Sequence, residues 1–290
     1  MKKLIVTIAL LFELFCSPTH LSASAFKFSQ DDSIHFFLMR GLTRESGHWG
    51  RNFEDSLMQV FPNARVSFLD IPGSGIYHKK KANMSVNGLM QVIRADQNEN
   101  IQESSGRNIL VATSLGGMVA TEWIKSYPDD FNALVMLSAS FCNICTFNER
   151  AQPDARRQAT KVIFLRNVKK RERLLVKINS NDTASYDEIL NHWVAIQKKR
   201  PMRRRNILRQ TIAGLRYEFT GELPNVPLLI LGSKKDRLVS PTCIEKVHKR
   251  FGGQLNWHPT SGHGIPIDDP MWIINSIRKW GDNLGSELNV

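Results

Sequence analysis

The chain has 290 residues, of which 42 % are hydrophobic and 23 % charged. This composition is ordinary for a globular protein and excludes a disordered or low-complexity chain. The length is enough for one large domain with an insertion. A formal net charge of +12 favours anionic partners over cationic ones.

The N-terminus has the layout of a secretory signal peptide. Lys2 and Lys3 precede an apolar stretch over residues 4–12, and Ala23-Ser24-Ala25 offers a cleavage site of small residues. The apolar stretch is shorter than the ~20 residues that span a bilayer. We therefore expect residues 1–25 to be removed and the protein to be periplasmic or secreted. A core helix or a disordered start is the alternative, and the protein would then be cytoplasmic.

Strands and helices alternate along the rest of the chain. Short apolar runs predict strands at 33–39, 66–69, 109–111, 133–137, 226–231 and 254–257. Helical spacing of apolar residues predicts helices near 86–101, after residue 114, and over 272–280. This alternation is typical of a mostly parallel sheet covered by helices on both faces.

The positive charge is concentrated in one segment. Residues 150–217 contain 18 Lys and Arg against 5 Asp and Glu, whereas the rest of the chain sums to about −1. Apolar residues at helical spacing within this segment predict a few amphipathic helices with a basic outer face. A merely solvated face, an anionic membrane surface and an acidic substrate all remain open as explanations. Nucleic acid is not expected, because no DNA- or RNA-binding motif accompanies the charge.

Three cysteines lie beyond the predicted signal peptide. Cys142 and Cys145 form a lone C-x-x-C, and Cys243 is distant in sequence. A zinc site needs two more ligands than this pair provides, so no metal is expected here. No organic cofactor is expected either, because no motif in the chain implies one. A Cys142–Cys145 disulfide fits an oxidising compartment, but two free thiols in a loop are the favoured interpretation.

Ser114 lies where a buried strand turns into a helix. Ala112 and Gly116 flank it at the two positions where a sharp strand-to-helix turn leaves no room for large side chains. This spacing is typical of a nucleophile elbow, in which a strained turn exposes the serine hydroxyl. A serine that only caps the following helix is the alternative.

Ser114 follows one predicted strand, Asp236 follows a later one and His263 follows the last, which gives the order serine, acid, histidine. That order and five motifs resemble the α/β-hydrolase superfamily over roughly residues 33–284. The motifs are Arg40-Gly41, Asp70-x-Pro72-Gly73-x-Gly75, Ser114-Leu115-Gly116-Gly117, Gly232-x-x-x-Asp236 and Gly262-His263. Arg40-Gly41-Leu42 replaces the usual His-Gly and looks like a bacterial subgroup of serine hydrolases.

The resemblance implies a fold and a site. It implies an α/β-hydrolase core over residues 26–141 and 221–290, with a helical cap over 142–220 whose apolar side roofs the pocket. It implies Ser114 as nucleophile, His263 as base and Asp236 as the residue that orients the base. The backbone N–H groups of Leu42 and Leu115 would form the oxyanion hole.

Other polar residues compete for these roles. We expect Asp268 and Asp269 to cap the last helix, and His48 and His192 to be structural. Asp70 ends a strand but precedes the serine, which is the wrong order for the acid.

The expected reaction is hydrolysis of a small or lipid-like carboxylic ester or thioester through an acyl-enzyme. One alternative is removal of acyl groups from an acidic carrier protein, which an exported enzyme would not meet. The other is a binding protein that uses the basic cap on anionic surfaces.

Overall fold

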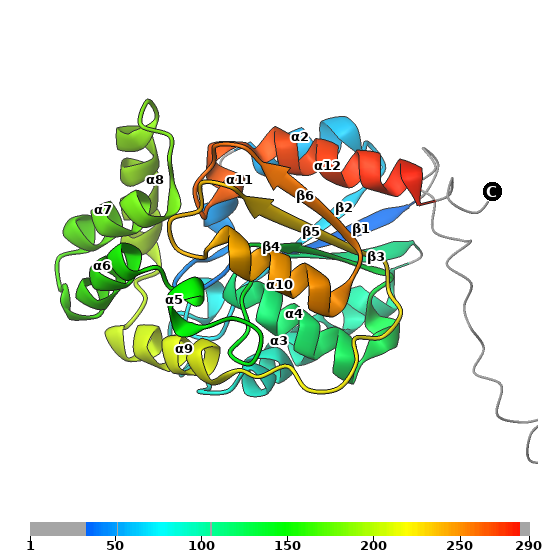
Figure 1. The fold of residues 1–290 in the computed structure, drawn as a ribbon, viewed down its shortest axis with the longest axis horizontal. Helices are drawn as coiled ribbons and strands as arrows, with labels where there is room; N and C mark the ends of the chain where they lie inside the picture. Colours follow the sequence, from blue (N-terminus) through cyan, green and yellow to red (C-terminus); the bar gives the residue numbers. More distant parts are fainter. Residues whose placement is uncertain (1–32, 51, 105, 285–290) are drawn as a thin grey trace, which may run out of the picture.

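Six parallel strands form the centre of the protein in a computed structural model that describes residues 33–50, 52–104 and 106–284 (Figure 1). The predicted signal peptide lies outside these residues. The strand order is β2-β1-β3-β4-β5-β6, so the predicted parallel sheet is confirmed. The strands are β1 (Ile34–Met39), β2 (Arg65–Leu69), β3 (Arg107–Thr113), β4 (Ala133–Leu137), β5 (Leu228–Ser233) and β6 (Gln254–His258).

The central strands are continuous apolar runs because both of their faces are covered. Every residue of β1, β4 and β5 is buried, whereas β2 and β6 at the edges are mostly half-buried or exposed. Strand β5 begins at Leu228, two residues later than predicted. Pro227 has no N–H to donate to a neighbouring strand, although its carbonyl accepts from the N–H of Leu134.

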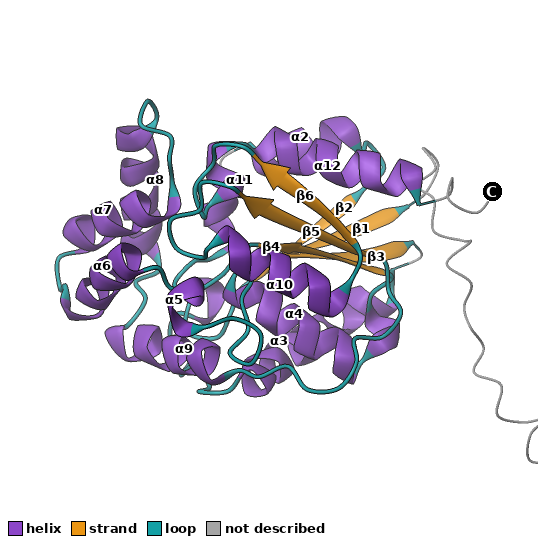
Figure 2. Cartoon of the chain, viewed as in Figure 1, coloured by secondary structure: helices purple, strands orange, loops and turns teal. Residues whose placement is uncertain are grey.

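Helices cover the two faces of the sheet (Figure 2). One face carries α3 (Val86–Gln102), α4 (Leu115–Ser126) and α10 (Pro241–Phe251), and their apolar residues share one core cluster. The other carries α2 (Phe53–Val60) and α12 (Pro270–Asn283), which belong to a second cluster. Short helices complete the core: η2 (Ser46–Trp49), η3 (Gly75–Tyr77), η4 (Pro128–Asp130) and α11 (Ile265–Asp268).

The basic insertion between β4 and β5 forms the helical cap. It contains α5 (Phe147–Arg150), α6 (Pro153–Phe164), α7 (Val168–Asn179), α8 (Tyr186–Lys199) and α9 (Arg204–Arg216). Helices α6, α7 and α8 build a small core of their own around Val162, Val176 and Trp193. None of the described helices combines the length and apolar character needed to cross a bilayer.

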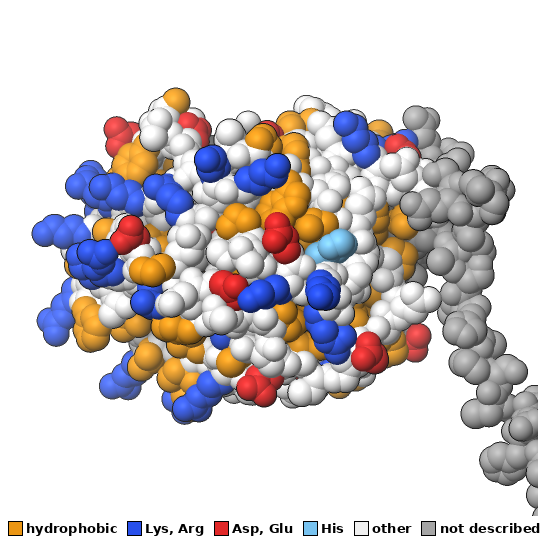
Figure 3. Space-filling view, viewed as in Figure 1, with side chains coloured by type: hydrophobic (Ala, Val, Ile, Leu, Met, Phe, Trp, Pro, Cys, Tyr) orange, Lys and Arg blue, Asp and Glu red, His pale blue; other side chains and the backbone are white. Residues whose placement is uncertain are grey.

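Most of the charge on the cap faces outward, as predicted. Figure 3 shows Lys and Arg side chains crowded over the cap helices at the left of the molecule. Two arginines of the segment contradict the prediction, because Arg150 and Arg171 are buried. Arg171 is one of two arginines that contact the fully buried Glu172, and Arg150 donates to backbone carbonyls.

A buried ion pair joins the cap to the core. Arg44, in the loop after β1, donates to Glu172 of α7 at 2.9 Å, and its guanidinium lies 4.4 Å from the centre of the Trp193 ring in α8. Arg171 donates to Glu172 at 3.1 Å and to Gln197 at 3.0 Å. Because removing one member of such a group leaves an uncompensated buried charge, the contact fixes the cap on the core.

Two carboxylates, those of Glu45 and Asp70, lie close together beside this ion pair. Burial, and next the nearby carboxylate of Asp70, raise the pKa of Glu45 to about 7. Arg200, the residue directly after α8, opposes the rise, with 3.6 Å between its Nη1 and Oε1 of Glu45. Glu45 is therefore largely protonated in the folded state at pH values where an exposed glutamate is ionised.

The disulfide pairing differs from the one considered for the C-x-x-C motif. Cys145 pairs with Cys243 of α10, with 5.3 Å between their Cα atoms, and Cys142 is free and exposed. The interpretation of Cys142 and Cys145 as two loop thiols is thus wrong for Cys145. The two partners are 98 residues apart, so only the fold could reveal the pair.

The shifted pKa of Glu45 makes stability depend on pH. Since the folded state holds this proton more tightly than the unfolded chain, the free energy of unfolding falls as pH rises from about 4.5 to about 7. Glu45→Gln removes the ionisation. We therefore expect the free energy of unfolding of this variant, measured relative to wild type, to be more favourable at pH 8 than at pH 4. Urea unfolding at both pH values measures this, with the exposed Glu54→Gln as control. An equal effect of Glu45→Gln at both pH values would contradict the assignment.

Candidate active site

Ser114 connects β3 to α4 through a strained turn. Its backbone has φ 54° and ψ −119°, a conformation that L-residues rarely adopt. The turn is held by a hydrogen bond from its N–H to the carbonyl of Leu137 in β4 at 2.8 Å, and by one from Gly117 to its own carbonyl at 2.9 Å. Ser114 is half-buried, so its side chain is accessible although the surrounding turn is covered.

Small residues around Ser114 are required by close backbone approach. A Cβ atom on Gly41 would lie 2.8 Å from the Cβ of Ser114, and one on Gly116 would lie 2.7 Å from the carbonyl oxygen of Arg40. Both distances are shorter than real contacts of this kind. The loop after β1 therefore touches the elbow directly, and a larger residue at either glycine would push the two apart.

Asp236 and His263 meet at the same edge of the sheet. They follow β5 and β6, and the Nδ1 atom of His263 donates to Oδ2 of Asp236 at 2.8 Å. The other carboxylate oxygen accepts from the N–H groups of Leu238 and Val239 at 2.8 and 3.0 Å. These bonds hold the carboxylate of Asp236 in place, and the carboxylate in turn fixes the orientation of the His263 imidazole. The Nε2 atom of His263 takes no part in the hydrogen bond to Asp236.

Asp268 binds the histidine loop to the cap. Its carboxylate accepts from the N–H of Gly262 at 2.6 Å, from the hydroxyl of Ser180 at 2.6 Å and from the N–H of Asn181 at 3.0 Å. The prediction that it caps the last helix is wrong for Asp268, since α11 ends there and α12 begins later. It is confirmed for Asp269, whose side chain accepts from the N–H of Trp272 at the start of α12.

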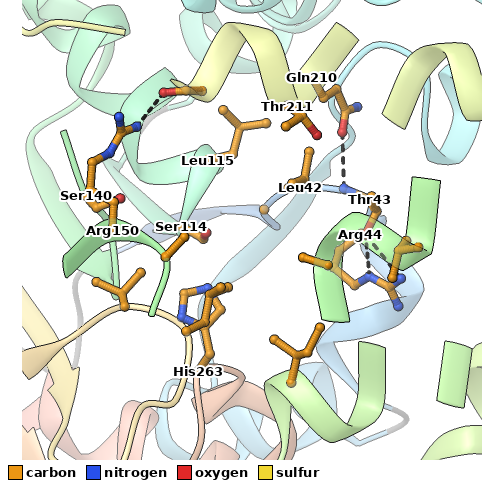
Figure 4. A pocket seen from close by; sticks show the side chains of 18 of the residues that line it. Leu42, Thr43, Arg44, Ser114, Leu115, Ser140, Arg150, Gln210, Thr211 and His263 are labelled. Atoms are coloured by element: carbon orange, nitrogen blue, oxygen red, sulfur yellow. Dashed lines mark hydrogen bonds between the residues drawn. The ribbon is translucent and has the colours of Figure 1, made fainter. Parts of the chain in front are cut away.

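Ser114, His263, Leu42 and Leu115 line one cavity of about 250 Å³ (Figure 4). Its walls are mainly apolar and come from both parts of the protein. The core contributes Leu115, Met118, Leu238 and Val239, and the cap contributes Val162, Ile163, Leu175, Ile178, Ile207 and Leu215. The apolar side of the cap thus covers the pocket as the sequence suggested. Four of the predicted site residues line this cavity, and Asp236 is connected to it through its hydrogen bond to His263. No hydrogen bond joins the Ser114 and His263 side chains in the described part of the chain.

The N–H groups of Leu42 and Leu115 belong to different segments. Leu115 is the first residue of α4, so its N–H has no carbonyl partner within the helix. Leu42 precedes Thr43, which has a positive φ of 64°. The N–H of Thr43 donates to Oε1 of the buried Gln210 in α9 at 3.1 Å, and Nε2 of Gln210 donates to the carbonyl of Pro72 at 3.0 Å.

Sequence reasoning missed Gln210. Its position in α9, three residues after the buried Ile207 and three before the buried Ala213, was the available signal. A polar side chain on an otherwise buried helix face needs a hydrogen-bond partner, and here the partner is the loop next to the serine.

The remaining polar candidates stabilise the loops, as expected. Burial, and next the positive charge of Arg44, lower the pKa of His48 well below its usual value, and its Nδ1 accepts from the N–H of Glu45 at 3.1 Å. His192 contacts the carbonyl of Gly47 at 3.0 Å. Asp70 accepts from two backbone N–H groups, those of Ser46 and Ile76. Within the described ranges, no three His, Cys, Asp or Glu side chains are grouped to hold a metal ion.

The fold resembles that of several solved hydrolases. An esterase from Thermogutta terrifontis superposes with a TM-score of 0.66 at 15 % identity, covering 88 % of this chain and 91 % of that one. An esterase from a Rhodococcus species has a TM-score of 0.66 at 18 % identity, covering 89 % of this chain and 94 % of that one. An enol-lactonase from Burkholderia xenovorans has a TM-score of 0.66 at 13 % identity, covering 88 % of this chain and 93 % of that one. At such low identities the likeness establishes the fold alone.

Sequence comparison identifies the family. No curated protein matches the chain. A family described as serine aminopeptidase, S33, matches residues 56–270, which include the Ser114 elbow, Asp236, His263 and the whole cap. With the six-stranded parallel sheet, this match establishes that the chain is a member of the S33 serine aminopeptidase-like family of α/β-hydrolases.

Proposed function

We propose that the protein is a serine hydrolase that cleaves a carboxylic ester or thioester through an acyl-enzyme on Ser114. The observation that carries the proposal is the 2.8 Å contact between His263 and Asp236, because His263 lines the same pocket as the strained Ser114 turn. A serine hydroxyl is a weak nucleophile at neutral pH and needs an adjacent base. The His263–Asp236 pair supplies a base of fixed tautomer.

The proposed reaction has two steps. The hydroxyl oxygen of Ser114 attacks the carbonyl carbon while Nε2 of His263 takes its proton. The tetrahedral oxyanion then accepts hydrogen bonds from the N–H groups of Leu42 and Leu115. Collapse breaks the bond to the leaving alcohol or thiol, which receives the proton from His263. A water molecule, activated by the same histidine, hydrolyses the acyl-enzyme and regenerates Ser114.

The substrate class follows from the pocket. Its mainly apolar walls favour an aliphatic or lipid-like acyl group over a polar peptide. The esterase names of structural neighbours such as those from Thermogutta and Rhodococcus agree with this choice. Hydrolysis of acyl groups on an acidic carrier protein is the alternative that applies if the protein is cytoplasmic.

Three substitutions test the assignment. Ser114→Ala and Asp236→Asn should each lower kcat for a 4-nitrophenyl ester by about 10³-fold or more, because the first removes the nucleophile and the second the partner of the base. Asp70→Asn is the matched control, since it changes another buried strand-end aspartate outside the pocket. Steady-state kinetics with circular dichroism as a folding check measure this. Full activity in Ser114→Ala would refute the proposal, and loss in Asp70→Asn alone would show that the acid is misassigned.

We also propose that the protein is exported. The signal-peptide pattern in residues 1–25 and a buried disulfide support this, since structural disulfides persist mainly in oxidising compartments. Protein purified from its native host should begin at Phe26. Non-reducing peptide mapping should recover Cys145 linked to Cys243 and Cys142 as a free thiol. Intact Met1 in a cytoplasmic fraction, with Cys145 and Cys243 as free thiols, would contradict export.

The cap surface favours an anionic membrane as a partner. Four large apolar side chains are exposed on α5, α6 and α9: Phe147 (53 %), Phe164 (68 %), Leu208 (46 %) and Leu215 (41 %). Figure 3 shows hydrophobic side chains next to Lys and Arg over the cap. We propose that this mixed surface binds anionic lipid reversibly, with each engaged Lys or Arg contributing about 1 kcal/mol at low salt.

Vesicle co-sedimentation tests this surface. Arg203→Gln with Arg205→Gln should weaken binding to anionic vesicles roughly 30-fold at low salt, since it removes two charges worth about 1 kcal/mol each. Arg204 is left in place because its Nε donates to the carbonyl of Ile163. The control is Lys249→Gln with Lys279→Gln on α10 and α12. Equal binding to neutral vesicles, or binding that does not depend on salt, would exclude an electrostatic surface.

A further inference from the structure

The pocket that contains Ser114 is lined by positive charge without negative charge. Four arginines line it, and no aspartate or glutamate does: Arg40, Arg44, Arg150 and Arg156. Two of the four are accounted for by neighbours. Arg44 pairs with Glu172, and Arg156 is only half-buried, donates to Asn148 and stacks over the ring of Phe147. The other two remain without a counter-charge.

Arg150 is the more informative of these two. It is 8 % exposed and forms no ion pair with an acid anywhere in the described part of the chain. Its Nη1 and Nη2 donate to the carbonyls of Leu215 and Gly214 at the end of α9, at 3.0 and 2.6 Å. Its Nε has no hydrogen-bond partner among the described residues. Helix-end carbonyls offset only part of a full charge.

Arg40 adds a second such group. It is 3 % exposed, its Nε and Nη1 lack partners among the described residues, and its guanidinium lies 5.3 Å from the centre of the Trp49 ring. Burial, and next the like charge of Arg44, lower the pKa of Arg40 to about 9, so it still carries a charge at neutral pH. Two buried cations without acids are costly to the folded state, and an anion in the pocket would compensate them.

We propose that the substrate is an ester with a carboxylate or phosphate group, and that Arg150 binds this anion in the pocket beside Ser114. Figure 4 draws Arg150, Ser140 and Ser114 on one side of the pocket, with Arg44 and Gln210 on the other. The apolar walls hold the aliphatic part of the substrate, and the charged group binds the guanidinium of Arg150, which has five N–H donors and gives two of them to the carbonyls of Leu215 and Gly214. The basic cap raises the local concentration of such an anion.

This inference rests on the proposed hydrolase function, so its test separates the two. Two matched pairs of esters locate the anion. The first pair is mono-4-nitrophenyl glutarate and neutral 4-nitrophenyl valerate, and it tests for an anion on the acyl side of the ester. The second pair is 4-acetoxyphenylacetate and neutral 4-methylphenyl acetate, and it tests for an anion on the alcohol side. We expect kcat/KM to favour the anionic member of one pair by about tenfold or more, as for hydrogen bonds to charged groups. Calorimetric binding of the same pairs to Ser114→Ala measures the preference without turnover.

The substitutions assign the preference to Arg150. Arg150→Gln should abolish the preference for the anionic ester. Arg150→Lys keeps the charge and should retain part of this preference, and it provides the test if the glutamine variant fails to fold. Arg157→Gln is the control, because Arg157 is on α6, is highly exposed and does not line the pocket. Equal use and equal binding of both members of each pair by the wild-type protein would overturn the inference. Anion-selective binding without any ester hydrolysis would overturn the hydrolase function instead.

Discussion

The strained backbone at Ser114 is the constraint on which the site depends. Its φ of 54° turns the chain from β3 into α4 within one residue, and the register of β3 with β4 secures the turn through the hydrogen bond to Leu137. The turn leaves no room for a Cβ at Gly41 or Gly116. Ser114 and Leu115, the first residue of α4, line the same cavity. A relaxed turn would separate the proposed nucleophile from the proposed oxyanion donors.

The cap takes part in building the site as well as covering it. Gln210 of α9 holds the Thr43 segment next to Leu42, and Glu172 of α7 neutralises Arg44 two residues along the same loop. Asp268 ties the His263 loop to the residues that follow α7. These polar contacts are buried or half-buried and come from segments far apart in sequence. Movement of the cap would therefore change the positions of the loops that carry the proposed oxyanion donor and the proposed base.

The sequence predicted the sheet, and which candidate site residues follow its strands, because each strand carries its own signal. Apolar runs placed the six strands, and Ser114, Asp236 and His263 each follow one of them in a recognisable order. The contacts that depend on the cap could not be predicted in this way. The pairing of Cys145 with Cys243 and the bond from Asp268 to the histidine loop require the folded arrangement. Arg150 and Arg171 looked like part of a solvated basic face, since composition does not show which cations are buried.

The proposed nucleophile is open to one direct measurement. A fluorophosphonate probe reacts covalently only with a serine that an adjacent base activates, so it reports the strained turn and the His263–Asp236 pair together. Peptide mapping by mass spectrometry should find the probe on Ser114 in wild-type protein and nowhere in Ser114→Ala, with much slower labelling in Asp236→Asn. Labelling of a different serine, or equal labelling of wild type and Ser114→Ala, would contradict the account.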